Sequence, residues 1–230
     1  MRAALLPCFA FLLSLAACRP PAPAVDIQRI EDQRIEASQE LIGALASGPA
    51  AQRARAALAM GRIQSPSYAT ALAAAVADTD GAIRGAALFA LGQLGLARGV
   101  TPPAEAVTAV RGALADPDPE LAALATDALG KLAPEGAEGE LAGLLSSPSP
   151  AVRAAAGLGL FRVRFAPVWR GQVDRAPEWS EDAKNALRKA LADPETEVRQ
   201  AAVHAFSRYG DAASVEALGT LLEDPDEWVR

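Results

Sequence analysis

A nine-residue pattern recurs six times along the chain and restricts its fold more than any other feature. Each copy begins with an apolar residue, has Asp or Ser two positions later, and in all but one copy ends in Arg. The copies begin at Leu45, Val76, Leu114, Leu145, Leu191 and Leu222, so successive copies are 31, 38, 31, 46 and 31 residues apart. A near-constant period with longer steps is typical of stacked structural units with insertions. The sequence therefore predicts a solenoid.

Each unit is predicted to contain two helices. In the third unit Val107, Val110 and Leu114 fall at helical spacing and form one apolar stripe. The Asp-Pro pairs that follow, such as Asp116-Pro117, end the first helix because a residue before Pro avoids the α region. Residues 26–46 are predicted to form one further helix, which would start unit one and cap the stack. Left-handed caps are expected at two glycines that follow second helices, Gly95 and Gly210.

The segment Leu-Ala-Asp-Pro-Glu-Thr-Glu-Val-Arg-Gln-Ala-Ala, from Leu191 to Ala202, resembles the short bacterial class of HEAT-like repeats, also called PBS-lyase-type repeats. The resemblance covers residues 26–230. It implies an all-α fold, a right-handed α-solenoid of about five and a half two-helix repeats. It also implies that Asp and Arg side chains form a structural ladder between repeats, here Asp78, Arg84, Arg153, Asp193 and Arg199, with Asp224 and Arg230 in the last unit. A ligand groove is the alternative interpretation of these columns, and Ala122 interrupts the Arg column.

The N-terminus is predicted to be a membrane address. A short apolar stretch ends in Leu15-Ala16-Ala17-Cys18, which resembles the lipobox of bacterial lipoproteins. The resemblance implies a signal peptide over residues 1–17, lipid on Cys18, and a Pro-rich tether over 18–25. Because Arg rather than Asp follows the Cys, we expect the outer membrane, facing the periplasm, in preference to the inner membrane. Ordinary secretion with cleavage nearby is the alternative.

Two insertions break the period, over residues 96–103 and 161–180. The longer one contains two of the three Trp residues and four Arg residues. Because aromatic side chains and Arg are common in interface hot spots, Trp169, Arg170 and Trp179 are candidate contacts to a partner. The alternative is a loop that folds back and covers the edge of a repeat with Trp169 and Trp179. The sequence leaves both open.

The sequence contains no recognised catalytic motif. Its only His is His204, and its only Cys residues are Cys8 and Cys18, so we expect no metal site, no cofactor and no small-molecule substrate. A net charge of −6 without a basic cluster argues against nucleic acid. The predicted function is a membrane-tethered, non-catalytic scaffold that binds a protein partner.

One alternative assigns these repeats to a larger envelope enzyme. The segment Ile27 to Asp32 before the repeats resembles lipoproteins that carry a cyclophilin-type peptidyl-prolyl isomerase domain downstream. Unit six stops at Trp228-Val229-Arg230, where its second helix should begin, so we expect the gene to continue beyond residue 230.

Overall fold

The computed structural model describes residues 25–208 and 214–230, and every regular element in them is a helix. Five first helices alternate with five second helices. The first helices are α2 (Gln39–Ser47), α4 (Ala69–Ala75), α6 (Ala104–Ala113), α8 (Ala137–Leu144) and α10 (Glu181–Ala190). The second helices are α3 (Ala50–Ile63), α5 (Gly81–Leu94), α7 (Pro119–Leu132), α9 (Pro150–Trp169) and α11 (Thr196–Ser207). The remaining elements are α1 (Ile27–Asp32), α12 (Val215–Thr220) and the 3-10 helices η1 (Pro66–Tyr68) and η3 (Leu221–Glu223).

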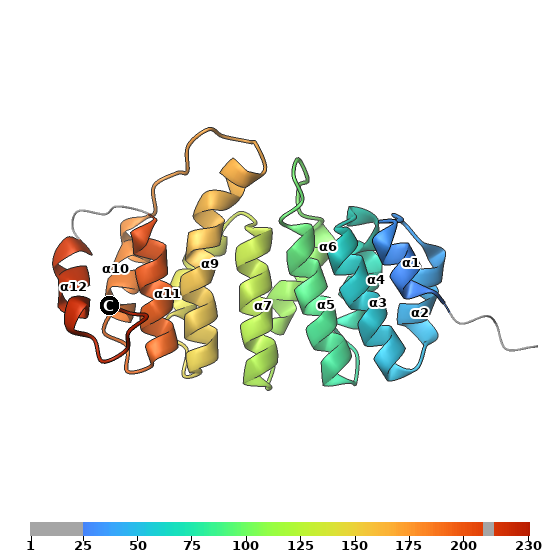
Figure 1. The fold of residues 1–230 in the computed structure, drawn as a ribbon, viewed down its shortest axis with the longest axis horizontal. Coiled ribbons are helices and arrows are strands. Elements are labelled where there is room, and N and C mark those ends of the chain that lie inside the picture. Colours follow the sequence, from blue (N-terminus) through green and yellow to red (C-terminus); the bar gives the residue numbers. More distant parts are fainter. Residues whose placement is uncertain (1–24, 209–213) are drawn as a thin grey trace, which may run out of the picture.

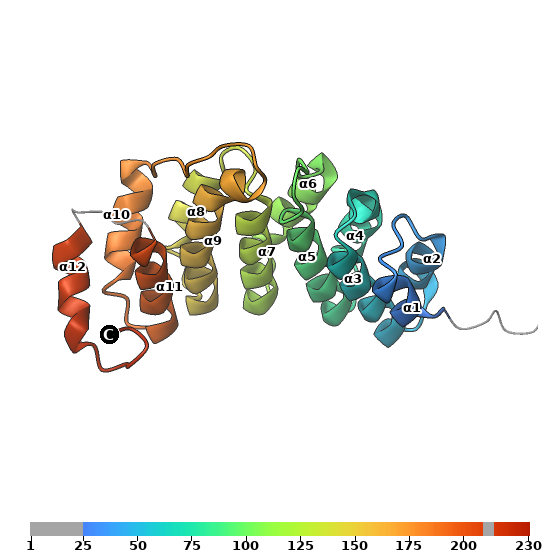
Figure 2. The ribbon, with the colours of Figure 1, turned by 45° about the horizontal axis from the view of Figure 1, so that its top comes forward.

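The two sets of helices form two layers. Each second helix packs against the next one along the array, and the first helices lie behind this row. The array is bowed, and the second helices lie along its inner side (Figures 1 and 2). We call this side the inner face and the side of the first helices the outer face. The predicted all-α solenoid is confirmed.

The turn inside each unit forms for the reasons that its sequence indicates. Asp118 and Ser149 are N-caps whose side-chain oxygens accept hydrogen bonds from the backbone N–H groups of Glu120 and Val152. Pro119 and Pro150 follow at the first helical position, where a missing N–H costs nothing. Each second helix therefore begins directly after the turn.

Glycine brings the second helices into contact. A methyl group at Gly61 would lie 2.7 Å from Cα of Ala90, one at Gly92 would lie 3.0 Å from Cα of Ala128, and one at Gly130 would lie 2.5 Å from Cα of Gly159. All three glycines stand eight residues after the last position of the nine-residue pattern. The core is consequently built from backbone contact and small side chains, in agreement with an aromatic content of 5%.

The N-terminal region differs from the single helix predicted over residues 26–46. It forms two helices, because Arg34 and Ala37 adopt positive φ angles of 48° and 53° between them. The buried Tyr68 holds this break: its hydroxyl donates to the carbonyl of Ile35 at 2.6 Å and accepts from the N–H of Ser38 at 3.0 Å. Helix α2 is thus the first helix of unit one, and α1 packs on α3.

The predicted cap at Gly95 is wrong, because this residue has φ −69° in the right-handed region. The left-handed caps lie at Gln64 and Ala133, with φ 60° and 40°. Gly95 is required for another reason: a methyl group there would lie 2.4 Å from the carbonyl oxygen of Lys131. Gly210 lies outside the described residues.

Candidate binding surface and the contacts that support it

The Asp and Arg columns pair across repeats. Arg53 pairs with Asp78 of the next unit, Arg84 with Asp116, Arg153 with Asp193, and Arg199 with Asp224. The same Arg also donates to a carbonyl in the turn of its own unit, as Arg153 does to Ser147 and Arg199 to Asp193, both at 3.0 Å. Within one unit the Asp and the Arg are six residues apart, and the carboxylate partner of each Arg is the Asp of the next unit, as a ladder between repeats requires.

Each ladder Asp interacts both with the backbone of its own turn and with an Arg side chain. One carboxylate oxygen accepts the backbone N–H two residues later: Asp78 accepts from Asp80, Asp193 from Glu195 and Asp224 from Asp226. The carboxylate also pairs with the Arg side chain of the preceding unit. Asp suits this position because its short side chain reaches the backbone of its own turn.

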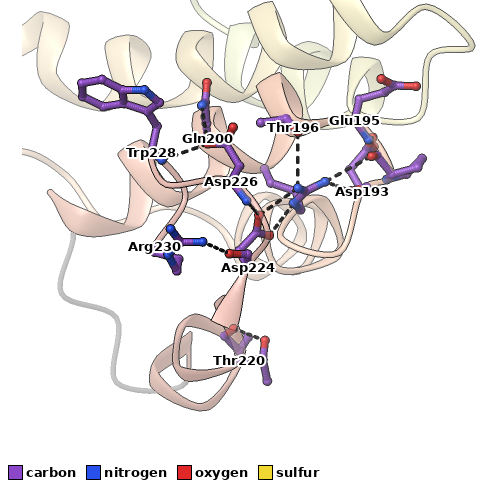
Figure 3. Close-up of polar contacts among 12 residues, drawn as sticks. Asp193, Glu195, Thr196, Gln200, Thr220, Asp224, Asp226, Trp228 and Arg230 are labelled. Carbon is purple, nitrogen blue, oxygen red and sulfur yellow. Dashed lines mark hydrogen bonds and ion pairs between the residues drawn. The ribbon is translucent and has the colours of Figure 1, made fainter. Parts of the chain in front are cut away.

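Two rungs are bidentate. Nε and Nη2 of Arg153 lie 2.8 Å from the two carboxylate oxygens of Asp193. In the last rung, the corresponding atoms of Arg199 lie 2.7 and 2.9 Å from those of Asp224. Figure 3 shows Asp193, Thr196 and Asp224 gathered around this rung. Fork-to-fork geometry fixes the orientation of neighbouring repeats as well as adding to their stability.

These hydrogen bonds lower the carboxylate pKa values. The backbone N–H of Asp80 is the main cause of the lowered pKa of Asp78, and the Arg199 guanidinium is the main cause at Asp224. Burial works to raise the pKa of Asp193, but the hydrogen bonds from Arg153 and from the Glu195 backbone outweigh it. A carboxylate with a lowered pKa in the folded state stabilises the fold above its unfolded pKa, about 3.9 for Asp. That stabilisation is lost as the pH falls below this value.

One rung is missing, between units three and four, where Ala122 and Ser147 replace the Arg and the Asp. Other contacts join these two units. Arg111 on α6 forms hydrogen bonds with both carboxylate oxygens of Glu140 on α8, and Arg162 on α9 pairs with Asp127 on α7. The junction is therefore held from both faces instead of at the turn.

We expect Arg153→Ala to lower the free energy of unfolding by about 2 kcal/mol, because Asp193 would keep its partly buried charge without its partner. Arg111→Ala is the matched control: Arg111 also forms a fork with a carboxylate, but its side chain is 40% exposed against 13% for Arg153. Exposed pairs contribute about 0–1 kcal/mol. Urea unfolding at pH 7 measures both losses. Equal losses would show that burial of the rung is unimportant.

The longer insertion begins as helix. Helix α9 continues through Phe161 and ends at Trp169, with Pro167 inside its last turn. The irregular part is therefore residues 170–180, shorter than the predicted insertion of 161–180. Two of the three candidate contacts lie at its ends, and their side chains are inside the protein.

Trp179 is 3% exposed. Its indole N–H donates to the carbonyl of Leu160 at 3.1 Å, and its ring meets Phe206 of α11 edge to face. Arg164 donates to the carbonyl of Pro177 at 2.8 Å and stacks over the Trp179 ring. Residues 176–179 thus cover the junction of α9 with α11, as the covering-loop alternative expects for Trp179 but not for Trp169.

Arg170 is 6% exposed and reaches across two repeats. Its Nε and Nη2 donate to the carbonyl of Gly95, and Nη2 also donates to the carbonyls of Lys131 and Leu132. These carbonyls belong to the C-terminal ends of α5 and α7, where helix dipoles place partial negative charge. Burial lowers the pKa of the guanidinium. Arg170 is therefore a cation that caps two helices, and its charge is balanced by carbonyl groups.

Trp169 is the candidate contact that reaches the surface, with 42% of its side chain exposed. It belongs to a set of aromatic and charged side chains on four second helices. We call this set the inner strip: Phe89 on α5, Asp127 and Lys131 on α7, Phe161, Arg162, Phe165 and Trp169 on α9, and His204 on α11.

Contacts join these side chains in two groups, which meet at the neighbouring residues Phe161 and Arg162 of α9. Lys131 lies 5.4 Å from the Phe89 ring centre and 2.6 Å from Asp127, which also pairs with Arg162. The Phe161 ring is 4.8 Å from Phe165 and 4.7 Å from His204. The strip offers aromatic faces and paired charges, a composition typical of protein-binding surfaces. Sequence reasoning missed most of it, because its members are adjacent only when the repeats are stacked.

The strip has no features of a metal centre. Within residues 25–208 and 214–230, no group of three His, Cys, Asp or Glu side chains is arranged to hold a metal ion.

Comparison with known families gives the class of repeat. The family of HEAT repeats matches residues 171–230, and the family of PBS lyase HEAT-like repeats matches residues 52–78. The chain therefore carries HEAT-like repeats, as the nine-residue pattern indicated. Comparison with curated proteins gives no match.

Solved structures share the architecture. The Escherichia coli protein YibA is 16% identical, with a TM-score of 0.58 over 91% of this chain and 73% of that one. The complex of CpcE and CpcF of phycocyanin lyase from Nostoc sp. PCC7120 is 21% identical, with a TM-score of 0.50 over 84% of this chain and 73% of that one. Likeness at these identities concerns the fold alone.

Proposed function

We propose that this protein is a non-catalytic scaffold that binds a protein partner on its inner face, tethered to an envelope membrane by lipid on Cys18. The inner strip carries the binding half of this proposal. The ladder side chains lie at the turns, where they pair with one another and join the repeats. Trp169 and His204, by contrast, remain exposed on the inner face. A solenoid that displays such side chains on one face can bind a partner by shape alone.

A photo-crosslinking amino acid tests the binding half in cells that produce the full chain. Placed at His204 on the inner face, it should join the protein to a second polypeptide. Placed at Glu105, an exposed residue of α6 on the outer face, it should give little product. Equal yields at the two positions would refute a dedicated inner binding face.

The anchoring half rests on Leu15-Ala16-Ala17-Cys18, which lies outside the described residues. Within the described residues, none of the helices has the length and apolar character needed to cross a bilayer. We propose the bacterial outer membrane, facing the periplasm, as the site of attachment. The alternative, in which the repeats precede a peptidyl-prolyl isomerase domain, stays a prediction.

Cys18→Ser should release the protein from the membrane fraction or leave its precursor unprocessed, because two or more acyl chains are needed for stable attachment. Membrane fractionation and the mass of the mature protein measure this. Cys8→Ser is the control and should leave attachment unchanged. A mature wild-type mass without added acyl chains would contradict the proposal.

A further inference from the structure

Trp228 is presented to solvent by its place in the repeat. The residue two positions before the end of the nine-residue pattern is exposed or half-buried in every unit: Ala51, Ala82, Glu120, Ala151, Glu197 and Trp228. Trp228 is 80% exposed at this position. Its exposure therefore agrees with that of the equivalent residue in the other five units.

The turn that carries Trp228 is fixed. One carboxylate oxygen of Asp226 accepts from the backbone N–H of Trp228 at 2.9 Å and from the Gln200 amide at 3.1 Å. The next residue, Val229, is 3% exposed and anchors the turn in the core. Figure 3 shows Gln200, Asp226 and Trp228 side by side, with the indole pointing away from the turn. A large aromatic face is thus held in place without being covered.

A groove of about 710 Å³ lies beside this indole, between α9 and α11. Small side chains, Ala154 and Ala201, line it together with Leu158, and Glu197 and Trp228 are also among its lining residues. A second groove of about 470 Å³ shares Glu197 and leads past Ala151 to Glu120. Neither Glu120 nor Glu197 has a side-chain ion pair or hydrogen bond within the part of the chain that the structure describes.

An unpaired carboxylate and a held indole that line the same groove can together bind a guanidinium. The flat cation stacks on the face of Trp and donates two hydrogen bonds to a carboxylate in its own plane. The second carboxylate, Glu120, adds attraction for another basic residue further along, and the small side chains between leave room for a backbone to pass. Phosphate groups of nucleic acid or lipid would be repelled by both carboxylates.

We propose that this surface docks an extended basic segment of a protein partner, with one Arg side chain seated between Trp228 and Glu197. This inference rests on the proposed scaffold function and deepens it by giving the chemistry of the partner. It uses a part of the inner face next to the inner strip, which it meets at His204.

The test uses the purified chain and a capped, fluorescein-labelled peptide of three Arg-Pro-Ala units, followed by fluorescence anisotropy. We expect saturable binding that weakens about tenfold in Trp228→Ala and in Glu197→Gln, since each removes one half of the Arg seat. One matched variant, Glu216→Gln, removes an exposed carboxylate of α12 and should bind as the wild type does.

A peptide with citrulline in place of Arg keeps the shape and loses the charge, so it should not bind. Equal binding of the citrulline peptide, absence of binding by the Arg peptide, or equal weakening by Glu216→Gln would overturn the inference. Crosslinking at His204 shows whether only the proposed Arg-binding site is wrong or the proposed scaffold function is wrong as well. A partner captured there without peptide binding would refute the Arg seat alone, and the absence of both would refute the scaffold as well.

Discussion

Replacing Arg170 with Met should lower the free energy of unfolding by about 3 kcal/mol. Met keeps most of the length and volume of the side chain but removes every donor, so the carbonyls of Gly95, Lys131 and Leu132 lose this hydrogen-bond partner. The favourable charge at the ends of α5 and α7 is lost in the same step. Urea denaturation followed by circular dichroism measures the change.

Arg175→Met is the control for Arg170→Met, since Arg175 lies in the same segment and is exposed. Its effect should stay within about 0.5 kcal/mol, as is usual for surface substitutions. Amide hydrogen exchange adds a local readout: in Arg170→Met it should become faster at the C-terminal ends of α5 and α7. Equal stability of the two variants would show that Arg170 does not hold the repeats together.

Gly130→Ala should cost more than about 2 kcal/mol, although Ala normally favours a helix over Gly. The new methyl group would lie 2.5 Å from Cα of Gly159, and backbone atoms cannot move aside as a side chain can. Gly112→Ala, inside α6, is the matched substitution: nothing lies within 4 Å of its methyl group. It should stabilise the protein by about 0.5–1 kcal/mol through helix propensity alone.

The changes in stability expected for Gly130→Ala and Gly112→Ala have opposite signs, and this difference tests how closely the second helices pack. Thermal unfolding of both variants under one set of conditions is sufficient. Stabilisation by Gly130→Ala would mean that α7 and α9 are further apart than the structure places them.

Local sequence predicted the helices because each signal acts over a few residues. Asp116-Pro117 ends a first helix and Asp118-Pro119 starts the next one, wherever the unit lies in the array. The same is true of the apolar stripe of Val107, Val110 and Leu114. Repetition of these signals at a near-constant period was enough to establish a solenoid.

Contacts between distant residues could not be predicted in this way. The break at residues 33–38 depends on Tyr68, some thirty positions later, and the cap at Gly95 is replaced by a close approach of α7. Arg170 looked like a surface residue because its acceptors, Gly95 and Leu132, are 75 and 38 positions away. Spacing identified the ladder columns but not which Arg meets which Asp.

The candidate site could likewise be predicted only in part from the sequence. Composition drew attention to the Arg and Trp residues of the second insertion, and Trp169 is exposed as a binding residue must be. Trp179, identical in type and ten positions away, is buried against Phe206. Burial decides between these two roles, so Trp169→Ala alone separates binding from folding, whereas a double substitution with Trp179 would affect both.

We propose that the ladder joins the repeats and that the inner strip binds the partner. Crosslink yield at His204, measured together with the free energy of unfolding in Arg84→Ala and Trp169→Ala, tests this division of roles. We expect Arg84→Ala to lose stability and keep its crosslink yield per folded molecule, and Trp169→Ala to stay within about 1 kcal/mol of the wild type while its yield falls. A ladder variant that loses the crosslink while folded, beside a Trp169 variant that keeps it, would contradict the claim.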